Sequence, residues 1–280
     1  MTNEIETFSL DTPDYQNNCV SCIGGRQENQ DSCGITVTRR GLLVLVCDGM
    51  GGMAGGATAS RIAVQTITDC ISGEPEEDNL EDDNRLALVK AIQAANAAIL
   101  EQASQDPSLT GMGTTVAALL INAEKAVVAH VGDSRVYQLR DHKKVFRTFD
   151  HSMVFELVRK KVVTEEQARL SAQSNVILRA LGIKAELDVE VTELPYEKDD
   201  VFFLCSDGIW GTLPEPELLK SITTKQHPKV ITETLAMKIH SEGIRQGCHH
   251  DNLTAAMVKT TTASRMRPKS GGFLSHLFGK

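Results

Sequence analysis

One stretch of the sequence, GLLVLVCDGMGGMAGG at residues 41–56, constrains the fold more than any other. The apolar run Leu42–Cys47 has the length and composition of a buried strand, and it ends abruptly at Asp48. A glycine-rich segment follows, in which the backbone carries almost no side chains. The pattern predicts a carboxylate at the tip of a buried strand, with backbone free to approach whatever that carboxylate binds.

Four more aspartates occupy similar places. Asp207 follows the apolar run Val201–Cys205, Asp31 and Asp251 precede β-rich runs, and Asp133 lies in AHVGDSR. A single aspartate at such a place is usually a turn former or a helix cap. Five of them predict that neighbouring strand ends bring carboxylates to one edge of a sheet.

Clustered carboxylates repel one another unless a cation lies between them, and oxygen ligands favour Mg²⁺ or Mn²⁺. Two such ions can share a carboxylate and activate a water. We therefore expect Asp48 to bridge two metal ions and the backbone carbonyl of Gly49 to bind one of them.

Two other site classes fit the same residues less well. Gly49, Gly51 and Ala54 match the dinucleotide fingerprint G-x-G-x-x-A, but Asp48 would then face a pyrophosphate and the other aspartates would have no role. No Gly-Lys-Ser/Thr follows, so a Walker A loop is absent. Cys47 and Cys205 are not in a C-x₅-R arrangement, so we interpret them as small buried hydrophobic residues.

The order of the predicted elements indicates an α+β fold. Strands are expected at Leu42–Cys47, Val116–Ile121, Ala126–Val131 and Val201–Cys205, and helices at Thr58–Ile71, Asn84–Ser104 and Val230–Ile244. Strands come in groups and helices in pairs, which favours sheets covered by helices over a doubly wound fold.

Two segments stand apart from this pattern. Residues 150–182 are polar and helical in character, with a capping box at Thr164–Gln167, and are predicted to be an insertion. We expect one domain over residues 15–260, followed by a basic, disordered tail at 261–280.

The composition narrows the protein class further. The net charge of −8 over 280 residues disfavours a nucleic-acid binder. The chain shows neither a secretory signal nor an apolar run long enough to span a bilayer, so we expect a cytoplasmic protein without a transmembrane segment. Seven cysteines spread over the chain favour reduced thiols, and Cys19-x-x-Cys22 lacks the second pair that a zinc site needs.

The chain resembles the type 2C metal-dependent protein Ser/Thr phosphatases in their bacterial form. The resemblance extends from about Ile23 to Val258 through eight motifs in order: GGRQENQDSCG, VLVCDGMGGMAGGATAS, GMGTTVAALLI, AHVGDSRVYQLR, TFDHSMVFELV, NVILRALG, VFFLCSDGIWGTL and DNLTAAMV. It implies a four-layer αββα fold, in which a central sandwich of two antiparallel sheets is flanked by helices. It also implies hydrolysis of phosphoserine and phosphothreonine in proteins, with a Ser/Thr kinase of the same cell as the opposing enzyme, and a monomer.

The resemblance implies roles for individual residues. Asp48 would bridge two Mn²⁺ or Mg²⁺ ions, Asp207 and Asp251 would bind one of them, and Asp31 would act through a metal-bound water. Arg26 would bind the substrate phosphate, Asp133 would help to hold a third, weakly bound ion, and residues 150–182 would form a mobile flap beside the cleft.

The sequence also departs from the pattern of this family. Gln30 and Gly211 stand where acidic residues are usual, Met53 and Ala57 replace a His and a Glu, and Met50 occupies a position where some members carry a His. These changes keep an alternative open, a pseudophosphatase or phosphoprotein-binding module without turnover. His249 and His250 are interpreted as loop residues, with an acid–base role as the second possibility.

Overall fold

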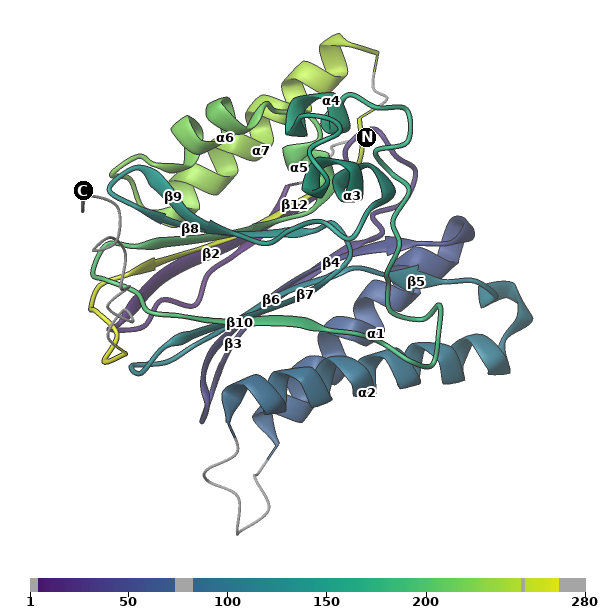
Figure 1. Ribbon diagram of the computed structural model, residues 1–280, viewed down its shortest axis with the longest axis horizontal. Helices are drawn as coiled ribbons and strands as arrows, with labels where there is room; N and C mark the ends of the chain where they lie inside the picture. The colour runs from purple at the N-terminus through teal and green to yellow at the C-terminus, as the bar shows by residue number, and fades with distance from the viewer. Residues whose placement is uncertain (1–4, 74–82, 248–249, 267–280) are drawn as a thin grey trace, which may run out of the picture.

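The computed structural model describes residues 5–73, 83–247 and 250–266, and two antiparallel sheets packed face to face form its centre (Figure 1). The first sheet has the order β1 (Glu6–Phe8), β2 (Tyr15–Cys22), β12 (Leu253–Thr260), β11 (Val201–Cys205), β8 (Arg135–Arg140) and β9 (Lys143–Arg147). The second has the order β10 (Glu190–Leu194), β7 (Ala126–Val131), β6 (Val116–Ile121), β4 (Gly41–Met50) and β3 (Asp31–Thr38), and β5 (Gly113–Thr114) pairs with β4. The predicted sandwich is confirmed.

Helices cover the outer face of each sheet (Figure 1). The second sheet is covered by α1 (Gly52–Ser72) and α2 (Asn84–Gln105), followed by the short 3₁₀ helix η1 (Pro107–Leu109). The first sheet is covered by α3 (Met153–Arg159), α4 (Glu165–Arg169), α5 (Asp207–Trp210), α6 (Glu215–Ile222) and α7 (Pro228–Arg245). Every helix in the described ranges is too short or too polar to cross a bilayer.

The hydrophobic core is divided into three clusters by these layers. Leu42, Val44 and Val46 of β4 face the interior of the sandwich, while Leu43 and Leu45 face α1 and α2. Such a strand is buried on both faces, which explains its continuous apolar run. The four strands expected from apolar runs are confirmed as β4, β6, β7 and β11.

The predicted start of the first helix was wrong. Helix α1 begins at Gly52, six residues before Thr58, and therefore includes Gly55 and Gly56. Glycine is a poor helix former, but here it permits close packing. A Cβ at Gly56 would lie 2.8 Å from the side-chain Cδ of Gln30, and one at Gly55 would lie 3.0 Å from Met112.

The segment at 150–182 joins β9 to β10 and carries α3 and α4. The predicted capping box is confirmed, because Thr164 and Gln167 exchange side-chain and backbone hydrogen bonds. The segment is not polar throughout: Val154, Phe155 and Ala168 are buried in the core between the first sheet and its helices. We refer to residues 150–182 as the flap.

The expectation of reduced thiols was wrong for two cysteines. Cys19 of β2 and Cys33 of β3 form a disulfide that connects the two sheets across the sandwich. Sequence spacing did not indicate this pairing, because it depends on how one sheet lies over the other. Cys22, Cys47, Cys70 and Cys205 are free, and Cys22 is bonded neither to Cys19 nor to another cysteine among the described residues.

The start of the predicted tail packs against the domain. The backbone amides of Ser264, Arg265 and Met266 donate to the carbonyls of Tyr196, Ala123 and Glu124. Residues 267–280, on which most of the tail prediction rests, lie outside the described residues.

Candidate metal centre

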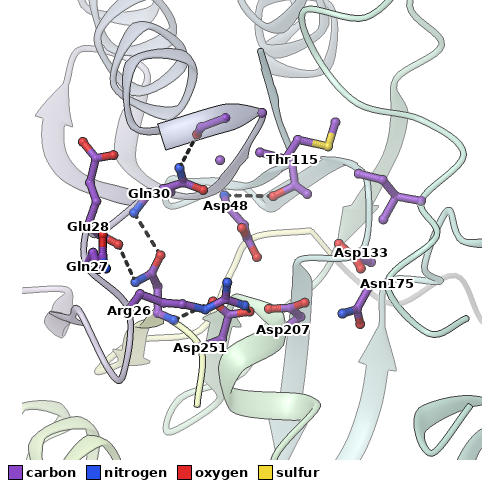
Figure 2. A pocket seen from close by; sticks show the side chains of 16 residues that line it. Arg26, Gln27, Glu28, Gln30, Asp48, Thr115, Asp133, Asn175, Asp207 and Asp251 are labelled. Carbon is purple, nitrogen blue, oxygen red and sulfur yellow. Dashed lines mark hydrogen bonds and ion pairs between the residues drawn. The ribbon is translucent and has the colours of Figure 1, made fainter. Parts of the chain in front are cut away.

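A cleft of about 710 Å³ opens at the end of the sandwich where β4 and β11 terminate (Figure 2). Its walls come from both sheets, from the loop between β2 and β3, and from the flap. The lining residues are Arg26, Gln27, Glu28, Gln30, Asp48, Gly49, Met50, Gly51, Gly52, Thr115, Asp133, Asn175, Ile177, Asp207, Asp251 and Asn252.

Six of the seven residues singled out from the sequence line this cleft. The second sheet contributes Asp48 and Gly49 at the end of β4, and Asp133 in the turn after β7. The first sheet contributes Asp207, which begins α5 after β11, and Asp251, which precedes β12. Arg26 enters from the loop between β2 and β3 (Figure 2).

Asp31 is the exception. It pairs with Asp48 in the β3–β4 register, yet it is buried and lines a second cavity, of about 580 Å³, to which β1, β3 and α1 contribute. Its carboxylate accepts a hydrogen bond of 2.7 Å from the hydroxyl of Ser206, the residue before Asp207. Asp31 therefore does not line the cleft, and its hydrogen bond to Ser206 links it to the turn that begins at Asp207.

The backbone of Asp48 is clamped by two threonines. Its amide donates to Thr115 Oγ1 at 3.0 Å, and its carbonyl accepts from the Thr115 amide at 2.8 Å and from Thr114 Oγ1 at 2.9 Å. Thr115 Oγ1 in turn lies 2.7 Å from Ser134 Oγ, beside Asp133. The motif GMGTT therefore positions Asp48, a role that the sequence interpretation missed.

Glycine at position 49 is required by close packing of the backbone. A Cβ there would lie 2.1 Å from the carbonyl oxygen of Gly56 and 2.5 Å from that of Gln30. The lack of a side chain lets β4, α1 and the Gln30 backbone meet at the wall of the cleft. This is a structural reason for the glycine-rich sequence that follows Asp48.

Asn252 joins the loops that carry the other cleft residues. Its amide nitrogen donates to the carbonyls of Ile23 and Glu28, and its amide oxygen accepts from the Gln30 amide at 2.9 Å. A Cβ at Gly208 would lie 2.0 Å from the Asn252 carbonyl oxygen, so the turn after Asp207 contacts the turn after Asp251. Asn252 was also missed, although it directly follows Asp251 in the sequence.

The carboxylates of the cleft raise one another's pKa. Loss of hydration raises the pKa of Asp48 and of Asp133 well above the usual value, and neighbouring aspartates add to this shift. The same causes raise the pKa of Asp207 to about 6, and burial raises that of Asp31 to about 7. Among the described residues, no lysine or arginine forms an ion pair with Asp48, Asp133 or Asp207.

Asp251 differs because it already has a cation. Its Oδ2 lies 2.7 Å from Nη2 of Arg26, in a pair whose two side chains are both partly exposed. Exposed ion pairs contribute about 0–1 kcal/mol, so a divalent ion competes with this one easily. Arg26 would then be released toward the open cleft.

The donor set fits a hard divalent ion. Carboxylates of Asp48, Asp133, Asp207 and Asp251 and the Gly49 carbonyl supply only oxygen, and a shared cation would relieve their mutual repulsion. Gln30 adds no charge, and its side chain donates to the Gly52 carbonyl at 2.9 Å. His250 contacts His240 and does not line the cleft, while His249 lies outside the described residues.

A second group, His130, His151 and Glu190, brings potential metal ligands within 4.8 Å of one another. Its hydrogen bonds argue against a metal. The Gly132 amide donates to Nδ1 of His151, so the proton of a neutral ring is on Nε2, which faces Glu190 at 3.2 Å. The ring nitrogens of His151 are therefore satisfied by the protein, and we interpret this group as a structural contact between β7, β10 and the flap.

A protein-family model described as Protein phosphatase 2C matches residues 20–242. The serine/threonine phosphatase stp of Listeria monocytogenes is 32% identical over 246 residues, which cover 88% of this chain and 95% of that protein. The serine/threonine protein phosphatase PstP of Mycobacterium tuberculosis is 34% identical over 197 residues, which cover 70% of this chain and 36% of PstP.

Solved structures show the same architecture. The M. tuberculosis phosphatase PstP/Ppp aligns with a TM-score of 0.73 at 29% identity, over 88% of this chain and 98% of that one. The catalytic domain of PstP in complex with two manganese ions also aligns with a TM-score of 0.73, at 28% identity over 89% of this chain and 99% of that one.

Proposed function

Because this chain belongs to the protein phosphatase 2C family, we propose that it hydrolyses phosphoserine and phosphothreonine in proteins by a reaction that depends on two divalent ions. One observation carries the proposal. Asp48, Asp133 and Asp207 converge on one cleft from two sheets, and no arginine or lysine among the described residues is paired with them. The name of the manganese-bound PstP structure supports the choice of Mn²⁺ or Mg²⁺.

The chain's own residues would hold the two ions as follows. Asp48 would bridge them, the Gly49 carbonyl would bind one, and Asp207 and Asp251 would bind the other. Thr115 keeps Asp48 in place, and Ser206 links Asp31 to the Asp207 turn. When bound, such ions would lower the pKa of a coordinated water and neutralise charge on the phosphoryl group.

Arg26 is proposed to bind phosphate oxygens. Its guanidinium lies in the cleft and offers a planar pair of donors once Asp251 binds metal. Met50 lines the same cleft and has no ionisable group, so it cannot protonate the leaving oxygen. A polarised water, held in part by Asp133, would supply that proton.

Hydrolysis of a phosphopeptide tests the proposal. Chelator-treated protein is expected to be inactive and to recover with Mn²⁺ or Mg²⁺, with inorganic phosphate as the measured product. Full activity in excess chelator, with no metal retained by elemental analysis, would overturn it. Elemental analysis of the same samples separates metal loss from denaturation.

A second candidate is a phosphoprotein-binding module without turnover. Gln30, Ala57 and Gly211 favour it, because each removes an acidic group that is usual in the family. Binding of phosphopeptide without phosphate release at saturating Mn²⁺ would support this candidate.

We further propose that the substrates are phosphoproteins made by a Ser/Thr kinase of the same cell, and that the protein acts in signal transduction as a cytoplasmic monomer. The names of the relatives support phosphoprotein substrates. Size-exclusion chromatography with light scattering checks the oligomeric state.

A further inference from the structure

Phe155 of the flap packs against Trp210 of the turn that begins at Asp207, and one flap arginine, Arg169, is hydrogen-bonded to the end of this turn. Nη1 of Arg169, at the end of α4, donates to the backbone carbonyl of Gly211 at 2.8 Å. Its Nε and Nη2 donate to the two carboxylate oxygens of Glu166 at 2.9 and 2.7 Å, so the guanidinium plane is fixed. The Arg169 side chain is 13% exposed, which shields the contact from water.

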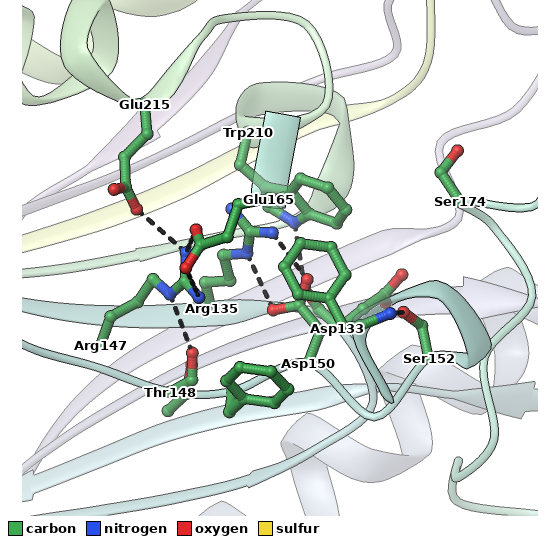
Figure 3. A network of polar contacts seen from close by, with 12 residues as sticks. Asp133, Arg135, Arg147, Thr148, Asp150, Ser152, Glu165, Ser174, Trp210 and Glu215 are labelled. Carbon is green, nitrogen blue, oxygen red and sulfur yellow. Dashed lines mark hydrogen bonds and ion pairs between the residues drawn. The ribbon is translucent and has the colours of Figure 1, made fainter. Parts of the chain in front are cut away.

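Gly211 closes the turn that Asp207 begins. Its amide donates to the Asp207 carbonyl at 2.6 Å, so the two residues are the ends of a single helical turn, α5. Within this turn, the indole Nε1 of Trp210 donates to the Asp133 carbonyl at 3.0 Å (Figure 3). The turn that Arg169 contacts therefore contains one cleft residue, Asp207, and is hydrogen-bonded to another, Asp133.

A flap segment shortly after Arg169 reaches the cleft itself. Asn175 and Ile177 line it, and Figure 2 shows the Asn175 side chain near Asp133 and Asp207. The amide of Met153 donates to the Val176 carbonyl, so this lining segment is held against the start of α3. Arg169 lies six residues before Asn175, between the buried residue Ala168 and the lining segment.

Two ion pairs of Arg147 also connect the flap to the rest of the domain, but they do not involve the Asp207 turn. Arg147 of β9 contacts Glu165 of α4 and Glu215 of α6 (Figure 3). Neither contact reaches α5. The Arg169 contact is the hydrogen bond, among those of the described residues, that joins α4 to the Asp207 turn.

We propose that Arg169 is a positioning residue that holds the lining segment of the flap at a fixed place relative to the Asp207 turn. The proposal rests on the proposed phosphatase function, and it concerns protein substrates. A phosphopeptide contacts the flap as well as the metal centre, whereas a small aryl phosphate needs only the metal centre. Loss of the contact then weakens phosphopeptide binding while the chemistry at the metals continues.

Arg169→Gln tests this in the full chain, because glutamine keeps a polar side chain but loses the fixed guanidinium. We expect KM for a phosphopeptide to rise about tenfold, since small displacements of positioning groups have large effects. The kcat for an aryl phosphate is expected to stay within about twofold of the wild-type value. Lys160→Gln is the matched control, because it removes a positive charge from an exposed flap position.

Trp210 supplies a readout that does not depend on activity. It is the only tryptophan of the chain, it is 3% exposed, and it lies in the turn that Arg169 contacts. Acrylamide quenching of its fluorescence is expected to increase in Arg169→Gln and to stay unchanged in Lys160→Gln. Glu166→Gln, which keeps Arg169 but loosens it, is expected to show a smaller change of the same kind.

The outcomes separate the two proposals. If the wild-type protein shows no Mn²⁺-dependent hydrolysis of the aryl phosphate, the proposed function fails. If it does, and Arg169→Gln matches wild type in phosphopeptide KM and in quenching, only the positioning role fails. Equal losses of activity on the phosphopeptide and the aryl phosphate, with a lower melting temperature, would also overturn the positioning role. If Arg169→Gln does not fold, Arg169→Lys and Glu166→Gln are measured in its place.

Discussion

Two groups of aspartates in this protein have opposite surroundings. Asp150 is fully buried and is bound by Arg135 through two hydrogen bonds, of 2.8 and 2.6 Å, with the guanidinium stacked 3.7 Å from the Trp210 ring (Figure 3). Asp200 is likewise buried and is bound by Arg140 and Gln138. The cleft aspartates Asp48, Asp133 and Asp207 have no such cation among the described residues.

The presence or absence of a paired cation distinguishes structural carboxylates from candidate metal ligands. Where the chain supplies a guanidinium, the negative charge is neutralised by the fold and the pair is structural. Where several carboxylates meet without one, they repel one another, and a bound cation or a proton relieves that repulsion. Asp133 and Asp150 flank the same arginine, Arg135, so the two kinds of environment adjoin.

The largest effect is expected from Asp48→Asn, which removes the proposed bridging charge and keeps the side-chain shape. Phosphopeptide turnover should fall about 10³-fold or more at saturating Mn²⁺, because charge stabilisation at the reacting group is lost. The metal-free variant should be at least as stable as wild type, since a repelling charge is gone. Asp188→Asn, at an exposed ion pair, is the control, and wild-type turnover in Asp48→Asn would contradict the assignment.

Asp150→Asn should show the reverse. Breaking a buried ion pair leaves Arg135 uncompensated and costs about 3–5 kcal/mol of the free energy of unfolding. Turnover per folded molecule should remain within about threefold at low temperature. Urea denaturation measures the loss, with Glu165→Gln as a control at a partly exposed pair. A free energy of unfolding equal to that of wild type would contradict the view that Asp150 has a structural role.

Much of the fold follows from local patterns in the sequence. Apolar runs such as Val116–Ile121 and Val201–Cys205 are strands because both of their faces are buried. The predicted start of α1 was wrong because Gly55 and Gly56 disfavour a helix in isolation. In the fold they lie inside the helix, where the absence of a side chain permits close contact with Met112 and Gln30. A local pattern cannot contain that reason.

The candidate site was accessible to sequence reasoning only in part. Aspartates at strand ends are conspicuous in the sequence, and the family resemblance assigned a role to each of them. Thr115 and Asn252 act through backbone hydrogen bonds that exist only once β5 pairs with β4 and residue 252 meets the loop at 23–30. The Cys19–Cys33 bond likewise depends on how β2 lies over β3.

Removal of metal should make stability depend on pH in a definite direction. The pKa of Asp31, at about 7, and that of Asp207, at about 6, exceed the unfolded value of about 3.9. The folded state therefore holds more protons than the unfolded state between pH 4 and pH 7, so the free energy of unfolding falls as the pH rises through this range. Melting curves of chelated protein should show a lower midpoint at pH 8 than at pH 5, and Mn²⁺ should reduce the difference. A midpoint that rises with pH in chelated protein would contradict this.

The disulfide crosses between the sheets that supply the cleft aspartates, and its removal should have a smaller effect. Cys33→Ser opens a cross-link with a sequence separation of 14, for which chain entropy predicts a loss of about 2–3 kcal/mol. Urea denaturation without reductant should show this loss, and wild type in dithiothreitol should match the variant. Cys70→Ser, at an exposed free thiol, is the control. Identical curves for wild type and Cys33→Ser without reductant would show that the bond does not form in solution.

The smallest effect is expected from a substitution of Asp133, which lies between the unpaired cleft aspartates and the Arg135–Asp150 pair. Its carboxylate lies in the cleft, while Arg135 two residues later binds Asp150. We expect it to help hold a third, weak ion, because Gly211 supplies no carboxylate for that ion and waters would fill most of its shell. Asp133→Ala should then lower turnover about tenfold while the two main ions stay bound, since a water polarised near the leaving oxygen is lost and Met50 cannot replace it. Calorimetric titration of Mn²⁺ into wild type and variant measures the number of ions, and the aryl phosphate measures turnover. If Asp133 only shapes the turn before Ser134, both proteins should bind the same number of ions and turn over at the same rate, and the third ion would have no part in catalysis.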